Sequence, residues 1–153
     1  VLADRLGADR GKWALAGLLH DLDVEITSAD LQVHGLRTVE ILESRGVDAE
    51  ILDAIRLHNE EAAGERRTEV FHHALAAGET ITGLIVATAL VYPDKKLASV
   101  RTRSIVKRMK EKAFARSVNR EIIRECEVIG IPLNEFAELS LGAMRSISDE
   151  LGL

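Results

Sequence analysis

Cysteine and aromatic residues are scarce in this chain of 153 residues, and each scarcity excludes something. Cys126 is the only cysteine, so no disulfide can form within the chain and a disulfide-stapled secreted scaffold is excluded. Aromatic residues make up 3% of the chain, whereas hydrophobic residues as a whole reach 46%. We therefore expect a core of Leu, Ile, Val and Ala, within one domain spanning residues 1–153.

Long uncharged runs and a surplus of positive charge are also missing. The longest stretch without a charged residue is residues 80–93, which is 14 residues, whereas a membrane-spanning helix needs about 20. The N-terminus has neither the basic region nor the apolar run of a signal peptide. Twenty Lys and Arg against 25 Asp and Glu give a net charge of −5, which argues against a nucleic-acid partner. We expect a cytoplasmic protein without membrane contact.

Apolar residues recur with helical spacing along nearly the whole chain, and no segment alternates convincingly with the period of a strand. Asp9, Asp48, Asn119 and Asn134 stand where they can cap the start of a helix. The sequence predicts an all-α bundle of about six or seven helices. The predicted helices cover residues 9–21, 34–45, 48–58, 68–92 with an interruption near Gly78, 102–111, and segments after 119 and 134, with loops at 22–32 and 59–66.

Positive charge is concentrated in residues 95–116, which hold nine Lys and Arg against one acid, Glu111. Such a segment can balance the acidic residues elsewhere in the chain, or it can steer an anionic substrate. Lys95 and Lys96 follow the longest predicted helix and are candidates to contact a substrate phosphate. Phe114 is the only aromatic residue in the segment, so stacking on single-stranded nucleic acid is not expected.

Three of the five histidines lie where predicted helices begin or end. His20 is followed by Asp21 at the end of an apolar helix, whose small Ala16 and Gly17 would let another helix approach closely. His34 stands at a helix start, and His58 at a helix end on the apolar face. One such histidine is usually a core residue, but three at helix termini favour a shared divalent-metal site.

Several motifs together resemble a known family. Residues 17–21, Gly-Leu-Leu-His-Asp, look like the signature of the HD-domain (HDIG-type) metal-dependent phosphohydrolases. The resemblance covers nearly the whole chain and is to a bacterial and archaeal subgroup of small, single-domain members. Its further motifs are His34-Gly35, residues 39–42, His58-Asn59, residues 82–85, residues 93–97 and residues 119–121. The resemblance implies a compact helical HD domain.

The resemblance also implies metal ligands. The His-Asp pair of the family maps onto His20 and Asp21, and its last carboxylate falls at Glu79, where the family usually has Asp. His34 and His58 match the additional histidines of members that hold two metals. The cofactor would be one or two divalent ions of Mn, Fe, Co, Zn or Mg, of which Mg is the least natural partner of histidine.

One histidine of the family pattern has no counterpart in the chain. Residues 1–6 look like the last turns of a helix closed by Gly7, so we expect the missing histidine in a helix that precedes Val1 and that this sequence lacks. If the protein has no such histidine, His72 is the substitute to consider. Otherwise His72 and its neighbour His73 are expected to be ordinary surface or interface residues.

The implied activity is metal-dependent hydrolysis of a small phosphate ester, for example a nucleotide. A bound cation makes hydroxide available near neutral pH and neutralises charge on a phosphate oxygen. Asp21 would be a catalytic metal ligand that can bridge two ions. Asp23 would orient water or act as a general base, unless it is a solvated loop acid.

Two alternatives remain open at this point. One is a non-catalytic HD-fold module that binds a nucleotide or a protein and has a degenerate metal site, as the Glu at position 79 and the missing histidine suggest. The other is a structural helical domain whose histidines are core residues. Expected partners are a small phosphorylated substrate and, as a further option, a second copy of the chain.

Overall fold

The computed structural model describes all 153 residues and consists of helices and turns, with no strand. The predicted all-α class is therefore confirmed. The structure has ten α-helices and one 3-10 helix instead of six or seven. The additional elements are short: α1 (Leu2–Leu6) has five residues, α5 (Glu60–Ala63) and α10 (Ser148–Leu151) have four each, and η1 (Leu97–Ser99) has three. Elements of one turn are too short to show a hydrophobic period.

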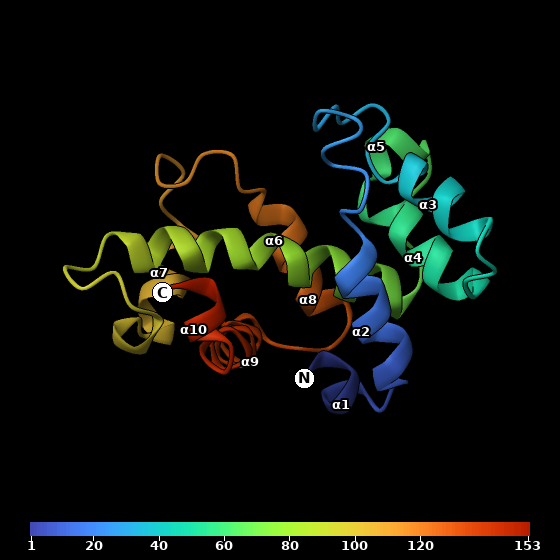
Figure 1. Ribbon diagram of the computed structural model, residues 1–153. Helices are drawn as coiled ribbons and strands as arrows, with labels where there is room; N and C mark the ends of the chain where they lie inside the picture. The colour runs from blue at the N-terminus through green and yellow to red at the C-terminus, as the bar shows by residue number, and fades with distance from the viewer. The chain divides into compact units, whose positions relative to one another are not determined.

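Contacts between Cα atoms divide the chain into two compact units, which we describe separately. The N-terminal unit is Leu2–Ala76, and the C-terminal unit is Ala77–Leu153 together with Val1. Helix α6 (Val70–Leu90), the longest in the structure, carries the boundary between the units (Figure 1). It runs without a break through Gly78, where an interruption was predicted.

Helix starts in the N-terminal unit follow the predicted caps. The helices are α1 (Leu2–Leu6), α2 (Arg10–Leu19), α3 (Leu36–Glu43) and α4 (Ala49–His58), followed by α5 (Figure 1). The Asp9 carboxylate accepts a hydrogen bond from the Lys12 N–H, and the Asp48 carboxylate accepts one from the Glu50 N–H. Each acid thereby satisfies an N–H group that has no partner within its own helix. The loop predicted at residues 59–66 contains α5.

The core of the N-terminal unit is aliphatic with one aromatic pair. Its buried members are Ala16, Leu42, Ile51, Ala54, Ile55, Phe71 and Leu75. The Trp13 ring stacks on the Phe71 ring with 4.9 Å between centroids. Ala16 is fully buried, as a close helix contact requires, but Gly17 is exposed and no neighbouring atom would lie within 4 Å of a Cβ there. The prediction of close packing therefore holds for Ala16 and is wrong for Gly17.

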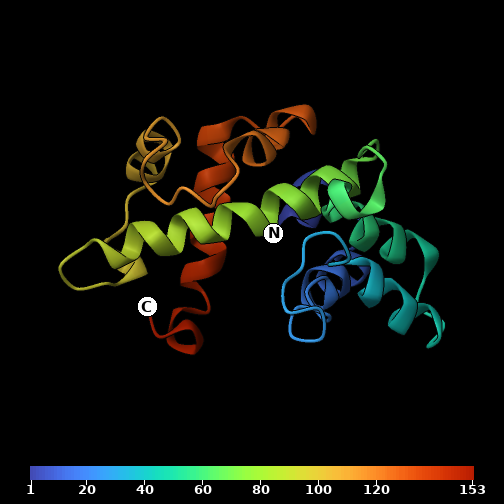
Figure 2. The same ribbon diagram turned by 90° about the horizontal axis from the view of Figure 1, so that it is seen from above.

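The C-terminal unit is organised around α9 (Leu133–Arg145), which contacts η1, α7 (Thr102–Arg108) and α8 (Arg120–Val128). Seen from above, α9 runs crosswise to α6 (Figure 2). The Arg145 guanidinium donates hydrogen bonds to the carbonyl oxygens of Leu97, Ala98 and Val100. Asn119 caps α8 as predicted. Asn134 does not cap α9, because the helix begins at Leu133, directly after Pro132.

Helix α6 is long and apolar enough to cross a membrane by length and composition alone. Half of its most apolar 18-residue stretch is buried inside the structure. A core helix of a folded domain passes the same test, so this feature is weak evidence for a membrane span.

Candidate metal centre

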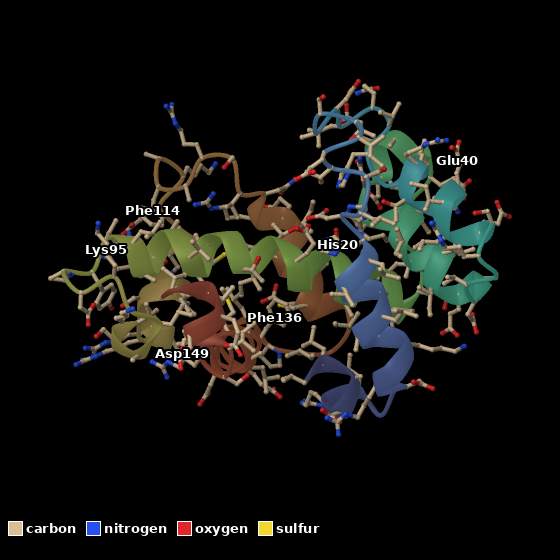
Figure 3. The ribbon with its side chains drawn as sticks, viewed as in Figure 1. His20, Glu40, Lys95, Phe114, Phe136 and Asp149 are labelled. Carbon is tan, nitrogen blue, oxygen red and sulfur yellow. The ribbon has the colours of Figure 1, made fainter.

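Four of the predicted site residues meet in the N-terminal unit. His20 directly follows α2 (Figure 3), Asp21 is the next residue, His34 ends the loop that leads to α3, and His58 is the last residue of α4. His34 and His58 are buried, and the side chain of Asp21 is 56% exposed. Solvent therefore reaches the site at the Asp21 carboxylate, whereas the His34 and His58 rings lie on its buried side.

Asp21, His34 and His58 place three ligand atoms within reach of one cation. The His34 Nε2 lies 3.1 Å from the Asp21 Oδ1 and 3.1 Å from the His58 Nε2, and the His58 Nε2 lies 4.0 Å from the same carboxylate oxygen. Metal–nitrogen bonds of about 2.0–2.1 Å in a tetrahedral site separate neighbouring ligand atoms by about 3.3 Å. The three observed spacings bracket that value, so the residues fit a divalent cation.

The other ring nitrogen of each histidine already has a partner. The Nδ1 of His34 lies 2.7 Å from the Asp23 Oδ1, and the Nδ1 of His58 lies 2.5 Å from the Ile55 carbonyl oxygen. The Nδ1 of His20 lies 2.9 Å from the Gly17 carbonyl oxygen. A carbonyl or carboxylate oxygen only accepts, so Nδ1 carries the proton and Nε2 of the neutral ring keeps its lone pair. All three rings thus offer the nitrogen that can bind a metal.

Electrostatics also favour neutral, ligating imidazole at His58. Burial lowers the pKa of His58 to about 4, and the neighbouring His20 and His34 act in the same direction. The neutral His58 Nε2 has a lone pair that faces the His34 Nε2 at 3.1 Å. Two lone pairs at that distance repel, and a cation bound between the rings would replace this repulsion with two favourable contacts.

His20 approaches the opposite side of the Asp21 carboxylate. Its Nε2 lies 3.4 Å from the Asp21 Oδ2, whereas His34 faces Oδ1. The His20 ring also meets the His58 ring edge to face, with 5.3 Å between centroids. The two oxygens of Asp21 therefore face different histidines, which is the geometry of a carboxylate that could bridge two cations.

Asp23 is buried behind His34, whereas a water-orienting residue, a general base or a solvated loop acid was predicted. Its side chain is fully buried and accepts hydrogen bonds from the His34 ring and from the N–H groups of Gly35 and Thr38. Burial would raise the pKa of Asp23, but the hydrogen bonds from Thr38, His34 and Gly35 together lower it below its ordinary value. An ionised carboxylate with every oxygen engaged behind His34 is not placed to accept a proton from solvent water, as a general base would.

Gly35 and Thr38 support the centre and carry no obvious signal in the sequence. Gly35 has φ +90°, and a Cβ there would lie 2.9 Å from the His58 Cε1. Only glycine allows this left-handed backbone and the close approach of the ring. The Thr38 hydroxyl accepts from the Asp23 N–H at 3.1 Å, although the two residues are 15 positions apart.

The remaining predicted residues lie in the C-terminal unit. Glu79 is on α6 and accepts a hydrogen bond from the Thr80 hydroxyl. Lys95 and Lys96 are exposed in the turn after α6 (Figure 3). The roles of Glu79 as a metal ligand and of the two lysines as phosphate contacts stay predictions.

One comparison with known proteins gives a match. The family model described as HD domain matches residues 1–90, which is more than half of the chain. This stretch contains every residue of the centre described above. No curated protein and no solved structure is detectably similar to the chain.

Proposed function

The chain belongs to the HD-domain family, which is part of a superfamily of metal-dependent phosphohydrolases. We propose that it hydrolyses a small phosphate ester with the help of a divalent cation. The observation that carries the proposal is the convergence of three Nε2 atoms on the Asp21 carboxylate, each on a ring whose Nδ1 is already engaged. Histidines that merely fill a core have no reason to share this orientation.

The ligand set suggests which cations fit. Two imidazoles and a carboxylate suit Mn, Fe, Co or Zn better than Mg, which prefers oxygen ligands. His34, His58 and Asp21 Oδ1 would hold one cation. His20 and Asp21 Oδ2 face the other side and would begin a second site. Glu79 stays a proposed metal ligand on the family resemblance alone. When bound, such a cation polarises a phosphoryl oxygen and lowers the pKa of a water.

The proposed substrate is a small phosphorylated metabolite or a nucleotide. Asp21 is the acid of the centre that reaches solvent, so an ester would approach from its side. Lys95 and Lys96 are the proposed phosphate contacts, because both are exposed basic residues. Basic side chains of this kind raise the local concentration of an anionic substrate.

The test is the cation content of protein purified without chelator, measured by elemental mass spectrometry for the wild type, Asp21→Ala and Asp30→Ala. Asp21→Ala removes the shared ligand and should lose the cation. Asp30 is an exposed acid of the same loop whose carboxylate accepts from the Gln32 N–H, whereas its contact with His34 is made by the backbone carbonyl, which Asp30→Ala retains, so this variant should keep the cation. The loaded wild type is then assayed for phosphate release from p-nitrophenyl phosphate and nucleoside monophosphates.

The outcomes separate the proposed hydrolase from its alternatives. A protein that takes up no Mn, Fe, Co or Zn even after reconstitution is not a metal-dependent hydrolase, and its histidines serve the core. A protein that binds a cation through Asp21 but releases phosphate from no ester is a non-catalytic binding module. Turnover that is present in the wild type and lost in Asp21→Ala supports the hydrolase.

A further inference from the structure

Asp23 contacts both the His34 ring and the start of α3, each through a different carboxylate oxygen. Its Oδ1 lies 2.7 Å from the His34 Nδ1. Its Oδ2 accepts from the Gly35 N–H at 2.8 Å and from the Thr38 N–H at 3.1 Å. The side chain has no exposed surface, so solvent cannot replace any of these bonds.

The Oδ2 bonds replace a missing helix cap. Gly35 occupies the N-cap position of α3 and has no side chain with which to cap the helix. Asp23 supplies the acceptor instead, from 12 residues earlier in the chain. The loop between α2 and α3 is thereby closed at its base, and the first turn of α3 is held next to His34.

We propose that Asp23 is a positioning residue that selects the His34 tautomer with the proton on Nδ1 and so leaves Nε2 free to bind the cation. This inference rests on the proposed function for the identity of the ligand at Nε2. Asp23 does not touch the cation or the substrate, and it acts only through His34. Carboxylates behind metal-binding histidines commonly fix the tautomer in this way.

The substitution Asp23→Asn separates the two tasks of the carboxylate. An amide has one acceptor oxygen and one NH₂ donor, so it cannot accept from both His34 and the helix start. The backbone N–H groups of Gly35 and Thr38 can only donate, and they will take the amide oxygen. The NH₂ group then faces the His34 Nδ1, which must become an acceptor. The ring proton moves to Nε2, where it blocks the lone pair that faces Asp21.

The first measurement is the tautomer of His34 in metal-free protein, by ¹⁵N NMR of labelled histidine at about pH 9, well above the ordinary pKa of the ring. The wild type is expected to carry the proton on Nδ1, and Asp23→Asn on Nε2. The second measurement is a titration with Co²⁺, whose visible absorption reports nitrogen and carboxylate ligands. Asp23→Asn is expected to bind Co²⁺ about 10–100-fold more weakly.

The matched control is Asp53→Asn. Asp53 also faces a buried histidine, with 3.0 Å between its Oδ2 and the His72 Nε2, but it lies outside the metal centre. Asp53→Asn should leave both the His34 tautomer and the Co²⁺ affinity unchanged. An equal loss of affinity in both variants would show that any disturbed buried pair weakens the site, and the proposal would be overturned.

The wild type alone can also overturn the proposal. If neutral His34 carries its proton on Nε2 in the metal-free wild type, Asp23 does not select the tautomer, whether or not Asp23→Asn folds. Unchanged tautomer and affinity in a folded Asp23→Asn protein have the same meaning. A wild type that binds no Co²⁺ contradicts the proposed function instead, and the NMR measurement still decides the role of Asp23.

Discussion

Two buried histidines of the N-terminal unit each face an aspartate, and the comparison shows what separates a ligand from a structural residue. His34 turns Nδ1 to Asp23 at 2.7 Å and leaves Nε2 towards Asp21 and His58. His72 turns Nε2 to Asp53 at 3.0 Å, and its Nδ1 faces backbone N–H groups. His34 therefore keeps one ring nitrogen available for a cation, whereas both ring nitrogens of His72 are engaged.

The partners of His72 explain its structural role. Its Nδ1 accepts from the N–H groups of Thr68 at 3.4 Å and Glu69 at 3.3 Å, directly before α6 begins at Val70. His72 is the third residue of α6, which is the position from which Glu or Gln reaches back in a capping box. His72 is therefore no substitute for a missing metal ligand. Of the two expectations for it, a surface or an interface residue, the first is wrong, because His72 is 4% exposed.

The largest expected effect is a contrast between two variants, one at His34 that loses cation binding and one at His72 that loses stability. His34→Ala should weaken cation binding more than about 100-fold, because it removes a direct ligand, and even residues that only orient such a ligand change metal affinity by about 10–100-fold. His72→Ala should leave cation affinity unchanged but lower the free energy of unfolding by about 1–3 kcal/mol, since it removes the acceptor of two backbone N–H groups at the start of α6 and the partner of Asp53. Isothermal titration with Zn²⁺ and urea unfolding measure the two quantities. Loss of Zn²⁺ binding in folded His72→Ala would break the comparison.

A smaller effect is expected at Gly35, where backbone and ligand geometry meet. Gly35→Ala forces a left-handed residue and a Cβ that would lie 2.9 Å from the His58 Cε1, so the ring must move. Backbone strain alone costs about 1–3 kcal/mol. The displaced ring should in addition weaken Zn²⁺ binding by about tenfold, which is within the range for residues that orient a ligand.

Gly46→Ala is the matched control for Gly35→Ala. Gly46 also has a positive φ, +72°, but no atom would lie within 4 Å of a Cβ there. It should therefore show the backbone strain in urea unfolding without a change in Zn²⁺ affinity. Equal Zn²⁺ affinities in the two variants would mean that the position of the His58 ring does not limit binding.

The sequence predicts features that depend on neighbouring residues. The caps at Asp9, Asp48 and Asn119 were correct, because a cap accepts from N–H groups two or three residues later. The prediction at Asn134 failed because α9 already begins at Leu133, so that Asn134 is its second residue and not its cap. Helix α5 was missed because four polar and small residues have no apolar face.

The residues of the candidate centre likewise differ in whether a local sequence pattern marks them. His20, Asp21, His34 and His58 could be singled out because each histidine lies beside a helix end that the sequence marks. The role of Asp23 could not, since its partners are 11 to 15 residues away and meet it only after the loop has folded. An acid in a polar loop is ordinarily solvated, and nothing local to residues 22–32 indicates that this one is buried.

The smallest expected effect is a pH dependence that belongs to His72. Burial lowers the pKa of His72 below its ordinary value of 6.5, more than the Asp53 and Glu69 carboxylates raise it, and His73 adds to the lowering. The unfolded chain then binds the proton more tightly than the folded one. The contribution of neutral His72 to the free energy of unfolding is therefore fully present above pH 6.5. It is lost as the pH falls towards the lowered pKa of His72. The slope for one proton is at most about 1.4 kcal/mol per pH unit.

His72→Gln isolates this contribution. A glutamine at the third position of α6 can still accept from the Glu69 N–H and donate to Asp53, but it does not titrate. The free energy of unfolding of metal-free His72→Gln, measured in urea between about pH 7 and pH 5, should therefore fall less steeply than that of the wild type. His58, whose pKa burial lowers to about 4, remains in both proteins, so the difference in slope belongs to His72. Identical slopes would mean that His72 binds its proton equally well in the folded and unfolded states, which would contradict this prediction.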